Sequence, residues 1–242
     1  MIDRAAPRDV LVLWDLDQTL LDAGGVDRQV WLDVCAELTG TVLESAEVVP
    51  GSTVRALMRS LLRQSGLGED DVDDVLPRAI GRERELLDAR RELLVQHGRA
   101  LPGARAAIEH FARAPHVTQS VLTGNQIDAA RIKLEAYGLA AGLDLSRGAF
   151  GSDTVHRPDL VVQALDTARW LGRALEPGDV LMVGDSVLDV EAARSHGARV
   201  VAVATGETPA SVLQDAGADL VVPDLVDLLP AMNSHPSLKG FL

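Results

Sequence analysis

The chain has 242 residues, a formal net charge of −13 at pH 7, 47% hydrophobic residues and 24% charged residues. This length can hold one sizeable core, or one core with a smaller appended unit, and the negative charge argues against a nucleic-acid or anionic-membrane surface. Cys35 is the single cysteine, which excludes an intramolecular disulfide and a cysteine-based metal site. Residues 1–9 lack the apolar stretch of a signal peptide, and no apolar run approaches the ~18 residues that span a bilayer. We therefore expect a cytoplasmic protein.

The first predicted element is an unbroken apolar run at residues 10–14, the pattern of a strand buried on both faces of a parallel sheet. Two carboxylates, Asp15 and Asp17, follow this run. Residues two apart in an extended chain point to the same side, so both are expected to face one pocket. Ligands in open α/β sheets bind beyond the carboxyl ends of the strands, which makes this strand end a candidate site.

Residues 22–100 carry apolar residues at helical spacing and are predicted to form an all-helical unit inserted directly after the first strand. Three helices are expected, at about 26–39, 53–65 and 69–97. Gly40 and Gly66 are expected to end the first two helices, and either Ser52 or Thr53 to cap the second. A break or kink is predicted in the third helix at Pro77 and Gly81.

From residue 101 onward, the predicted strands and helices alternate. The predicted strands are 117–122, 149–150, 180–183, 200–204 and 220–222. Predicted helices separate them at 103–113, 127–137, 160–171 and 187–196, with further helices after 208 and after 222. Alternation of this kind predicts an α/β fold with a doubly wound, parallel, Rossmann-like sheet. Residues 1–21 and 101–242 would form the sheet domain, and 22–100 the helical one.

Three of these strands end in polar side chains of a particular kind: Asp15 and Asp17, then Thr123, then Asp185 followed by Asp189. The carboxyl ends of strands in one sheet share an edge, so residues distant in sequence can converge there. Several carboxylates in one place would raise one another's pKa values unless a cation neutralised them. Hard oxygen ligands favour Mg²⁺. The alternative for any single Asp is that it only ends a strand or caps the next helix.

These residues and their order resemble the haloacid dehalogenase-like hydrolase superfamily, most members of which are phosphatases. The segments that carry the resemblance are Asp15-Leu16-Asp17-Gln18-Thr19-Leu20, Val121-Leu122-Thr123-Gly124-Asn125, Gly184-Asp185-Ser186-Val187-Leu188-Asp189 and Val203-Ala204-Thr205-Gly206. The helical insertion resembles the mobile cap of that superfamily in its α-helical form, as in phosphoglycolate phosphatase-like members.

The resemblance implies roles for these residues. Asp15 would be the nucleophile that takes the phosphoryl group as an aspartyl-phosphate, and Asp17 would be the general acid and then the general base. Asp185 would hold Mg²⁺ together with the Asp15 carboxylate and the Asp17 backbone carbonyl. The residues implied in a supporting or phosphate-binding role are Asp189, Thr123, Gly124, Asn125 and Arg157.

Two departures from the superfamily pattern concern its basic residues. The third motif is usually lysine followed by proline, and the nearest match is Arg157-Pro158. Arginine keeps the charge and changes the hydrogen-bond geometry. Lys133 is the rival for this role, although a lysine on that predicted helix could simply be solvated. Ser52 stands where related caps often carry a basic residue, with Arg55 one turn away.

The sequence therefore predicts an enzyme, a Mg²⁺-dependent phosphomonoesterase acting on a small phosphorylated metabolite, with no nucleic-acid or membrane partner and present as a monomer or homodimer. The alternatives are a phosphomutase, a carbon–halogen hydrolase, a catalytically silent binding or regulatory protein, and a receiver-type signalling domain. Asp17 and a metal would have no use in carbon–halogen hydrolysis. The acceptor aspartate of a receiver domain does not sit at the first strand with a helical insertion behind it.

Overall fold

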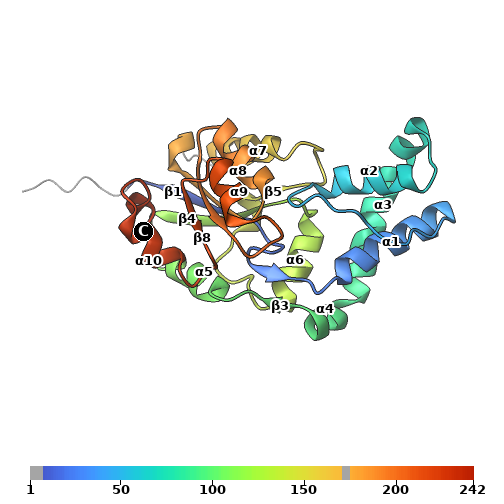
Figure 1. The fold of residues 1–242 in the computed structure, drawn as a ribbon, viewed down its shortest axis with the longest axis horizontal. Coiled ribbons are helices and arrows are strands. Elements are labelled where there is room, and N and C mark those ends of the chain that lie inside the picture. The colour runs from blue at the N-terminus through green and yellow to red at the C-terminus, as the bar shows by residue number, and fades with distance from the viewer. Residues whose placement is uncertain (1–7, 171–174) are drawn as a thin grey trace, which may run out of the picture.

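The computed structural model describes residues 8–170 and 175–242, and it centres on a six-stranded sheet (Figure 1). Every neighbouring pair of its strands is parallel. In spatial order the strands are β5 (Ala149–Phe150), β4 (Val117–Thr123), β1 (Val10–Trp14), β6 (Val180–Gly184), β7 (Arg199–Val203) and β8 (Leu220–Val222). With helices on both of its faces, this sheet confirms the predicted α/β, doubly wound, Rossmann-like class.

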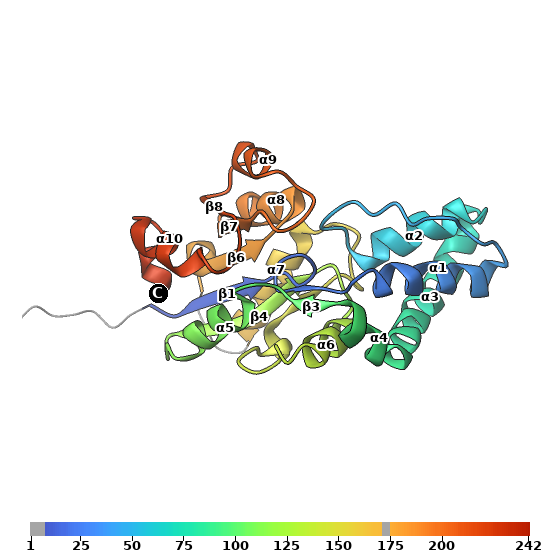
Figure 2. The ribbon, with the colours of Figure 1, turned by 60° about the horizontal axis from the view of Figure 1, so that its bottom comes forward.

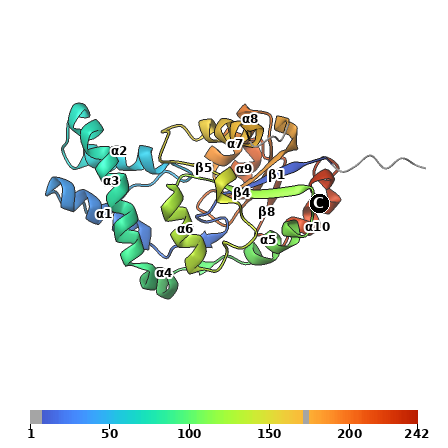
Figure 3. The ribbon, with the colours of Figure 1, turned by 180° about the vertical axis from the view of Figure 1, so that it is seen from behind.

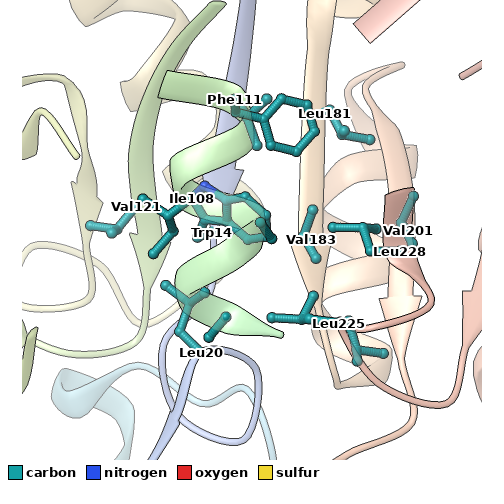
Figure 4. Packing of buried hydrophobic residues seen from close by; sticks show 14 of the residues in the cluster. Trp14, Leu20, Ile108, Phe111, Val121, Leu181, Val183, Val201, Leu225 and Leu228 are labelled. Atoms are coloured by element: carbon teal, nitrogen blue, oxygen red, sulfur yellow. The ribbon is translucent and has the colours of Figure 1, made fainter. Parts of the chain in front are cut away.

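Strand β1 lies in the middle of the sheet and is buried on both faces, as its apolar run predicted. One face packs on α5 (Ala104–Ala112), α6 (Ile127–Ala136) and α10 (Leu228–Ser234). The other face packs on α7 (Pro158–Trp170), α8 (Val187–Ser195) and α9 (Ala210–Asp215). Trp14 anchors the first of these cores: its ring meets that of Phe111 edge-on at 5.8 Å between centroids (Figure 4), and its Nε1 donates to Gln119 Oε1 at 3.0 Å.

Four helices follow the first motif and occupy the end of the molecule opposite α10 (Figure 2). We call them the cap helices: α1 (Val26–Thr39), α2 (Val54–Gln64), α3 (Glu69–Ala89) and α4 (Arg91–His97). Their apolar faces form a third core, to which α6 contributes Ala129 and Ile132. Helix α6 therefore has two packed faces, because Ala130 and Leu134 belong to the core of the sheet. It lies between the sheet and the cap helices in Figures 1 and 3.

The cap region differs from the sequence prediction in two respects. It is not entirely helical, because β2 (Leu21–Asp22) and β3 (Arg99–Ala100) pair in antiparallel fashion where the chain enters and leaves the insertion. The third helix is not broken at Pro77 or Gly81; it is interrupted at Arg90, between α3 and α4. Pro77 is exposed, so the carbonyl that it leaves unbonded can meet water, while burial of Val72, Leu76 and Ala79 holds the helix together.

Other predicted elements appear close to their expected bounds. Thr53 caps α2 by accepting a hydrogen bond from the Ala56 backbone N–H at 3.2 Å, and Gly40 ends α1 in the left-handed conformation. Cys35 is buried in the cap, and this burial raises the pKa of its thiol to about 11. No helix within 8–170 and 175–242 is long and apolar enough to cross a membrane. Residues 1–7, most of the segment assessed for a leader, and residue 171, the predicted end of a helix, lie outside these ranges.

Candidate active site

Three adjacent strands deliver the candidate residues to one edge of the sheet. Trp14 pairs with Val121 on β4 and with Val183 on β6, so the residues that follow β1 lie level with the ends of its neighbours. The Asp15 backbone N–H donates to Val183 O at 2.9 Å. Beyond Asp17 the chain turns sharply at Gln18, which has a left-handed φ of 62°. The predicted convergence of Asp15 and Asp17, Thr123, and Asp185 and Asp189 is what the structure shows.

Arg157 ties this edge to the cap. Its Nη2 donates to Asp15 Oδ1 at 2.7 Å and to Asp189 Oδ1 at 2.5 Å, and its Nη1 donates to the Gly51 carbonyl at 2.7 Å. The side chain is buried, and among the described residues its Nε finds no hydrogen-bond partner. Burial opposes the charge, but the carboxylates of Asp189 and Asp15 outweigh it and hold the pKa of Arg157 above its usual value. Arg157 thus places its positive charge beside Asp15 and Asp189 and bonds the cap at Gly51.

Asp185 and Asp189 are held by contacts close to the strand end. Thr19 Oγ1 donates to Asp185 Oδ1 at 3.1 Å. The loop after β7 passes so near that a Cβ on Gly206 would lie 1.9 Å from Asp185 Oδ2, which explains the glycine there. Asp189 Oδ2 accepts from the Ser186 backbone N–H at 3.0 Å and from Ser186 Oγ at 2.6 Å, closing the capping box of α8.

Asp15, Asp185 and Asp189 form a buried cluster whose carboxylate oxygens lie within 4.8 Å of one another. Burial, together with the charges of Asp189 and Asp17, raises the pKa of Asp15 to about 7, although Arg157 opposes the rise. Burial and the nearby charges of Asp15 and Asp189 raise the pKa of Asp185 to about 8. A cation would relieve this accumulation of charge, and carboxylate oxygens are the ligands of hard divalent ions. The donor set therefore fits a metal site.

Thr123 and Asn125 form a hydrogen-bonded pair at the end of β4. Asn125 Nδ2 donates to Thr123 Oγ1 at 2.8 Å and to Asp17 Oδ2 at 2.7 Å. Because the Thr123 oxygen accepts, its own hydroxyl proton stays available for a substrate. The Gly124 carbonyl accepts from the Val54 backbone N–H of the cap at 2.7 Å. Of the three residues predicted to bind phosphate here, Thr123 has a free donor, whereas both amide protons of Asn125 are directed at protein oxygens.

Lys133 corrects the sequence analysis, because its side chain is fully buried and not solvated. Its Nζ lies 2.8 and 2.9 Å from the two carboxylate oxygens of Asp17, 3.0 Å from Asp27 Oδ2 on α1, and 3.0 Å from Asn125 Oδ1. Burial opposes its charge, but Asp17 and Asp27 prevail and raise the pKa of Lys133. The sequence prediction was wrong because the position of Lys133 on a helix was compatible with an exposed lysine. In the structure Asp17 and Asp27, each more than a hundred residues away in sequence, contact the ammonium.

A cavity of about 190 Å³ lies between the sheet edge and the cap helices. Asp15, Asp17, Thr123, Arg157 and Asp185 line it from the sheet side. The cap side supplies mostly apolar and acidic groups, including Ala23, Asp27, Trp31, Val54, Leu57 and Glu83, with the arginine Arg28. Arg55, considered above as a basic residue of the cap, donates instead to the Ser152 carbonyl at 3.3 Å. Ser52 lines the cavity.

Comparison with known proteins shows which family this chain resembles. A family model described as HAD-hydrolase-like matches residues 156–228, which include Arg157, Asp185 and Asp189. A Chromobacterium violaceum protein named phosphoglycolate phosphatase is 32% identical over 144 residues, covering 60% of this chain and 61% of that protein. A Pseudomonas putida protein of the same name is 28% identical over 228 residues, covering 91% and 78%. The matched segment is therefore HAD-hydrolase-like, and these findings support the resemblance of the chain to the haloacid dehalogenase (HAD)-like hydrolase superfamily.

Solved structures agree with the fold of this chain. A Clostridium acetobutylicum protein described as a predicted phosphatase superposes with a TM-score of 0.71 at 20% identity, covering 94% of this chain and 99% of that one. At that identity the likeness bears on the fold alone. It extends over the cap helices as well as the sheet, because almost the whole of both chains is matched.

Sequence reasoning missed several residues of the candidate site. Thr19 lies inside the first motif and could have been found from it, since its hydroxyl bonds Asp185. Asp27 and Glu83 gave no signal, because single acidic residues in amphipathic helices are ordinarily solvated. Glu83 is buried and accepts from Trp31 Nε1 at 3.1 Å, and burial raises the pKa of its carboxyl. Gly51 contributes a backbone carbonyl, and side-chain patterns do not reveal such contacts.

Proposed function

We propose that this chain is a Mg²⁺-dependent phosphomonoesterase that hydrolyses a small soluble organophosphate through an aspartyl-phosphate on Asp15. The observation that carries the proposal is the buried cluster of Asp15, Asp185 and Asp189 with Arg157 bonded to two of its members. A nucleophile, a metal-binding carboxylate and a fixed cation in one cavity are what phosphoryl transfer needs. Relatives named phosphoglycolate phosphatase support the phosphatase class.

In the first half-reaction, a carboxylate oxygen of Asp15 attacks phosphorus, and the bond from phosphorus to the alcohol oxygen breaks. Asp17 gives its proton to that oxygen, so that the product leaves as a neutral alcohol. The Thr123 hydroxyl, the Gly124–Asn125 segment and the Arg157 guanidinium would bind the phosphoryl oxygens. Thr123 retains a free proton for this purpose, because its oxygen accepts from Asn125.

In the second half-reaction, Asp17 takes a proton from water, and the water oxygen attacks the phosphorus of the aspartyl-phosphate. The bond between phosphorus and the Asp15 oxygen breaks, which releases inorganic phosphate and restores the carboxylate. Asp17 is partly exposed, with 34% of its side chain accessible, so water and substrate can both reach it. One residue can thus serve as acid and then as base.

Mg²⁺ would be held by the Asp15 and Asp185 carboxylates and the Asp17 backbone carbonyl, with Asp189 in a supporting position. When bound, it supplies positive charge that offsets the charge on the transferring phosphoryl group. Asp189 fits its supporting role because its two oxygens already accept from Arg157 and Ser186.

We assign residues 1–21 and 101–242 to the catalytic core and residues 22–100 to the cap. The antiparallel pair β2–β3 lies at this boundary, and its two short strands are the entry to and exit from the insertion. A cavity of about 190 Å³, lined by both core and cap, supports a small phosphorylated metabolite as the substrate.

The test is a panel of aryl, alkyl, sugar and carboxylate-bearing phosphate esters, each assayed with Mg²⁺ and with excess EDTA. We expect phosphate release that needs Mg²⁺ and disappears in Asp15→Asn, because an amide cannot form the acyl-phosphate. Asp166→Asn, which removes an exposed carboxylate from α7, is the matched control and should behave as wild type. Undiminished turnover in EDTA would contradict the metal assignment.

The same panel separates the alternatives. Isomerised sugar phosphate without free phosphate would indicate a phosphomutase, and halide release from haloacids would indicate a carbon–halogen hydrolase. If no ester is turned over although phosphate binding is measurable, the site belongs to a catalytically silent member of the superfamily.

A further inference from the structure

Helix α6 and the two residues that cap it, Gln126 and Tyr137, present polar side chains to the cap. Gln126, Lys133 and Tyr137 fall within about 40° of one another around the helix axis at 100° per residue. Gln126 Nε2 donates to the Ile80 carbonyl of α3 at 2.6 Å, and Tyr137 Oη donates to the Leu94 carbonyl of α4 at 3.0 Å. Lys133 meets Asp27 of α1 at 3.0 Å. Three cap helices are therefore tied to one helix of the core (Figure 3).

Of these three residues, Lys133 alone also bonds to a residue assigned to the chemistry. Its ammonium has three protons and four acceptor oxygens around it, two of them on Asp17. No proton remains for a substrate. Asp17, Asp27 and Asn125 line the cavity, whereas Lys133 is absent from the described residues that do so. Any effect of Lys133 on the reaction must therefore pass through the groups that it holds.

We propose that Lys133 is a positioning residue that fixes the Asp17 carboxylate and links its position to the cap through Asp27. The inference rests on the proposed function, because it concerns the residue assigned there as acid and base. The side chain of Asn125 completes the arrangement. Its Nδ2 donates to Asp17, and its Oδ1 accepts from Lys133. Asp17 is held at both oxygens, and one of its two anchors is itself held by α1.

If Lys133 acts through Asp17, removing Lys133 should slow the same substrates that removing Asp17 slows. Aryl phosphates have good leaving groups and need little protonation, whereas alkyl phosphates depend on the acid. Loss of Lys133 should therefore slow alkyl-ester hydrolysis far more than aryl-ester hydrolysis. A residue that only stabilised the fold would slow both to the same degree.

The experiment compares the kcat values of wild type, Lys133→Met and Arg131→Met for p-nitrophenyl phosphate and for an alkyl phosphate from the panel. Arg131 is the matched control, since it lies on the same helix, is exposed and pairs only with its neighbour Asp128 among the described residues. We expect Lys133→Met to lose roughly 10–100-fold on the alkyl ester and less than about 5-fold on the aryl ester. Equal losses on the two esters would overturn the proposal.

A double-mutant cycle provides the second readout. Once Asp17→Asn has removed the acid, adding Lys133→Met should change kcat by less than about 3-fold, because residues acting in one unit are not additive. Fully additive losses would show that Lys133 acts elsewhere and would overturn the inference.

The cap link is tested by Asp27→Asn, which also serves if Lys133→Met does not fold. The amide keeps the size of the carboxylate and removes its charge, so Lys133 loses its ionic contact with the cap. We expect a smaller loss, roughly 3–10-fold, again concentrated on the alkyl ester. Asp33→Asn on the same helix is the control, because Asp33 pairs with Arg90 away from the cavity. Unchanged kcat values in Asp27→Asn would overturn the cap link.

Failure of the proposed function would have a different outcome. Wild-type protein inactive on both esters, or Asp15→Asn retaining full turnover, would overturn the phosphatase assignment and the role of Lys133 together. An active wild type with Asp15→Asn inactive, but with equal losses on the two esters in Lys133→Met, would overturn the role of Lys133 alone.

Discussion

The site contains two charged clusters built on the same plan. In the first, Arg157 binds Asp15 and Asp189 and reaches the cap at Gly51; in the second, Lys133 binds Asp17 and reaches the cap at Asp27. Each cluster joins one carboxylate from the end of β1, one cation from the core and one contact from the cap. The two carboxylates are only two residues apart, yet each is held by a cation of its own.

The clusters differ in how the cation reaches the cap. The guanidinium of Arg157 uses separate nitrogens, Nη2 for the carboxylates and Nη1 for a neutral backbone carbonyl. A lysine, which the superfamily usually has at this position, has a single nitrogen and lacks this fork of separate donors. Lys133 gathers all of its partners on that single atom, and its cap partner is charged. The comparison indicates that the arginine adds a contact between the nucleophile and the cap.

The largest effect after loss of the nucleophile is expected from removing the acid of the Lys133 cluster. Asp17→Asn keeps the hydrogen-bonding shape and loses the transferable proton, so kcat should fall by about 10²–10⁴-fold. Steady-state rates on aryl and alkyl phosphates provide the measurement. The loss should be smallest for the best leaving groups, and a loss independent of leaving group would argue against Asp17 as the acid.

Next in size is the effect of removing the cation of the first cluster. Arg157→Ala takes away charge beside Asp15 and the phosphoryl group, a contact typically worth about 3–4 kcal/mol in a closed site, so kcat should fall roughly 10²–10³-fold. Arg157→Lys should recover part of this, since it restores the charge and leaves Gly51 without its donor. If Arg157→Lys matches wild type in kcat and KM, the hydrogen bond from Arg157 to the Gly51 carbonyl does not contribute to activity.

Residues at the ends of strands could be predicted from the sequence, whereas contacts between a helix residue and partners distant in sequence could not. Asp15, Asp17, Thr123 and Asp185 were predictable, because buried strands end in polar residues at one edge of a parallel sheet. Arg157 was found because a proline follows it. The environment of Lys133 was not predictable: helical periodicity does not say which polar residue faces a packed neighbour, and Asp27 lies 106 residues away.

The fold shows the same division. The apolar runs and the alternation of elements predicted the sheet and the cap helices, because the spacing of apolar residues indicates which face of an element is buried. The two-residue strands β2 and β3 were missed, since they are too short to show a period. A break of the helix at Pro77 was predicted on local grounds, but the helix continues past it, because neighbouring apolar residues are packed in the cap core.

A moderate effect is expected where cap and core touch through backbone. A Cβ on Gly124 would lie 2.0 Å from the Ser52 carbonyl oxygen, next to the Gly51 carbonyl that Arg157 binds. Gly124→Ala should therefore push this loop away, at an overpacking cost of about 1–3 kcal/mol. We expect kcat/KM to fall by roughly 10-fold, because displacing this loop alters the contact between Arg157 and the Gly51 carbonyl.

The control for this variant is Gly178→Ala, because an added Cβ there meets no atom within 4 Å. Wild-type kinetics in both variants would show that the loop can move aside without cost to the site.

The smallest effect, a change in thermal stability with pH, again separates the two clusters. In the first cluster burial raises the pKa of Asp15 to about 7, and beside it burial raises the pKa of Asp185 to about 8. Each is protonated in the metal-free folded protein at pH 6 and ionised in the unfolded chain. The stability that this difference contributes is fully present below the ordinary carboxyl pKa near 3.8 and is lost as the pH rises through 7 to 8.

Mg²⁺ takes the place of those protons, so it should stabilise the protein little at pH 5 and most at pH 8. Melting curves at both pH values, with Mg²⁺ and with EDTA, measure this difference, at about 2–4 °C per kcal/mol for a chain of this size. Asp185→Asn should abolish the pH-dependent gain, because it removes a metal ligand. Asp27→Asn alters only the Lys133 cluster and should retain the gain. Equal stabilisation by Mg²⁺ at the two pH values would place its binding away from Asp15 and Asp185.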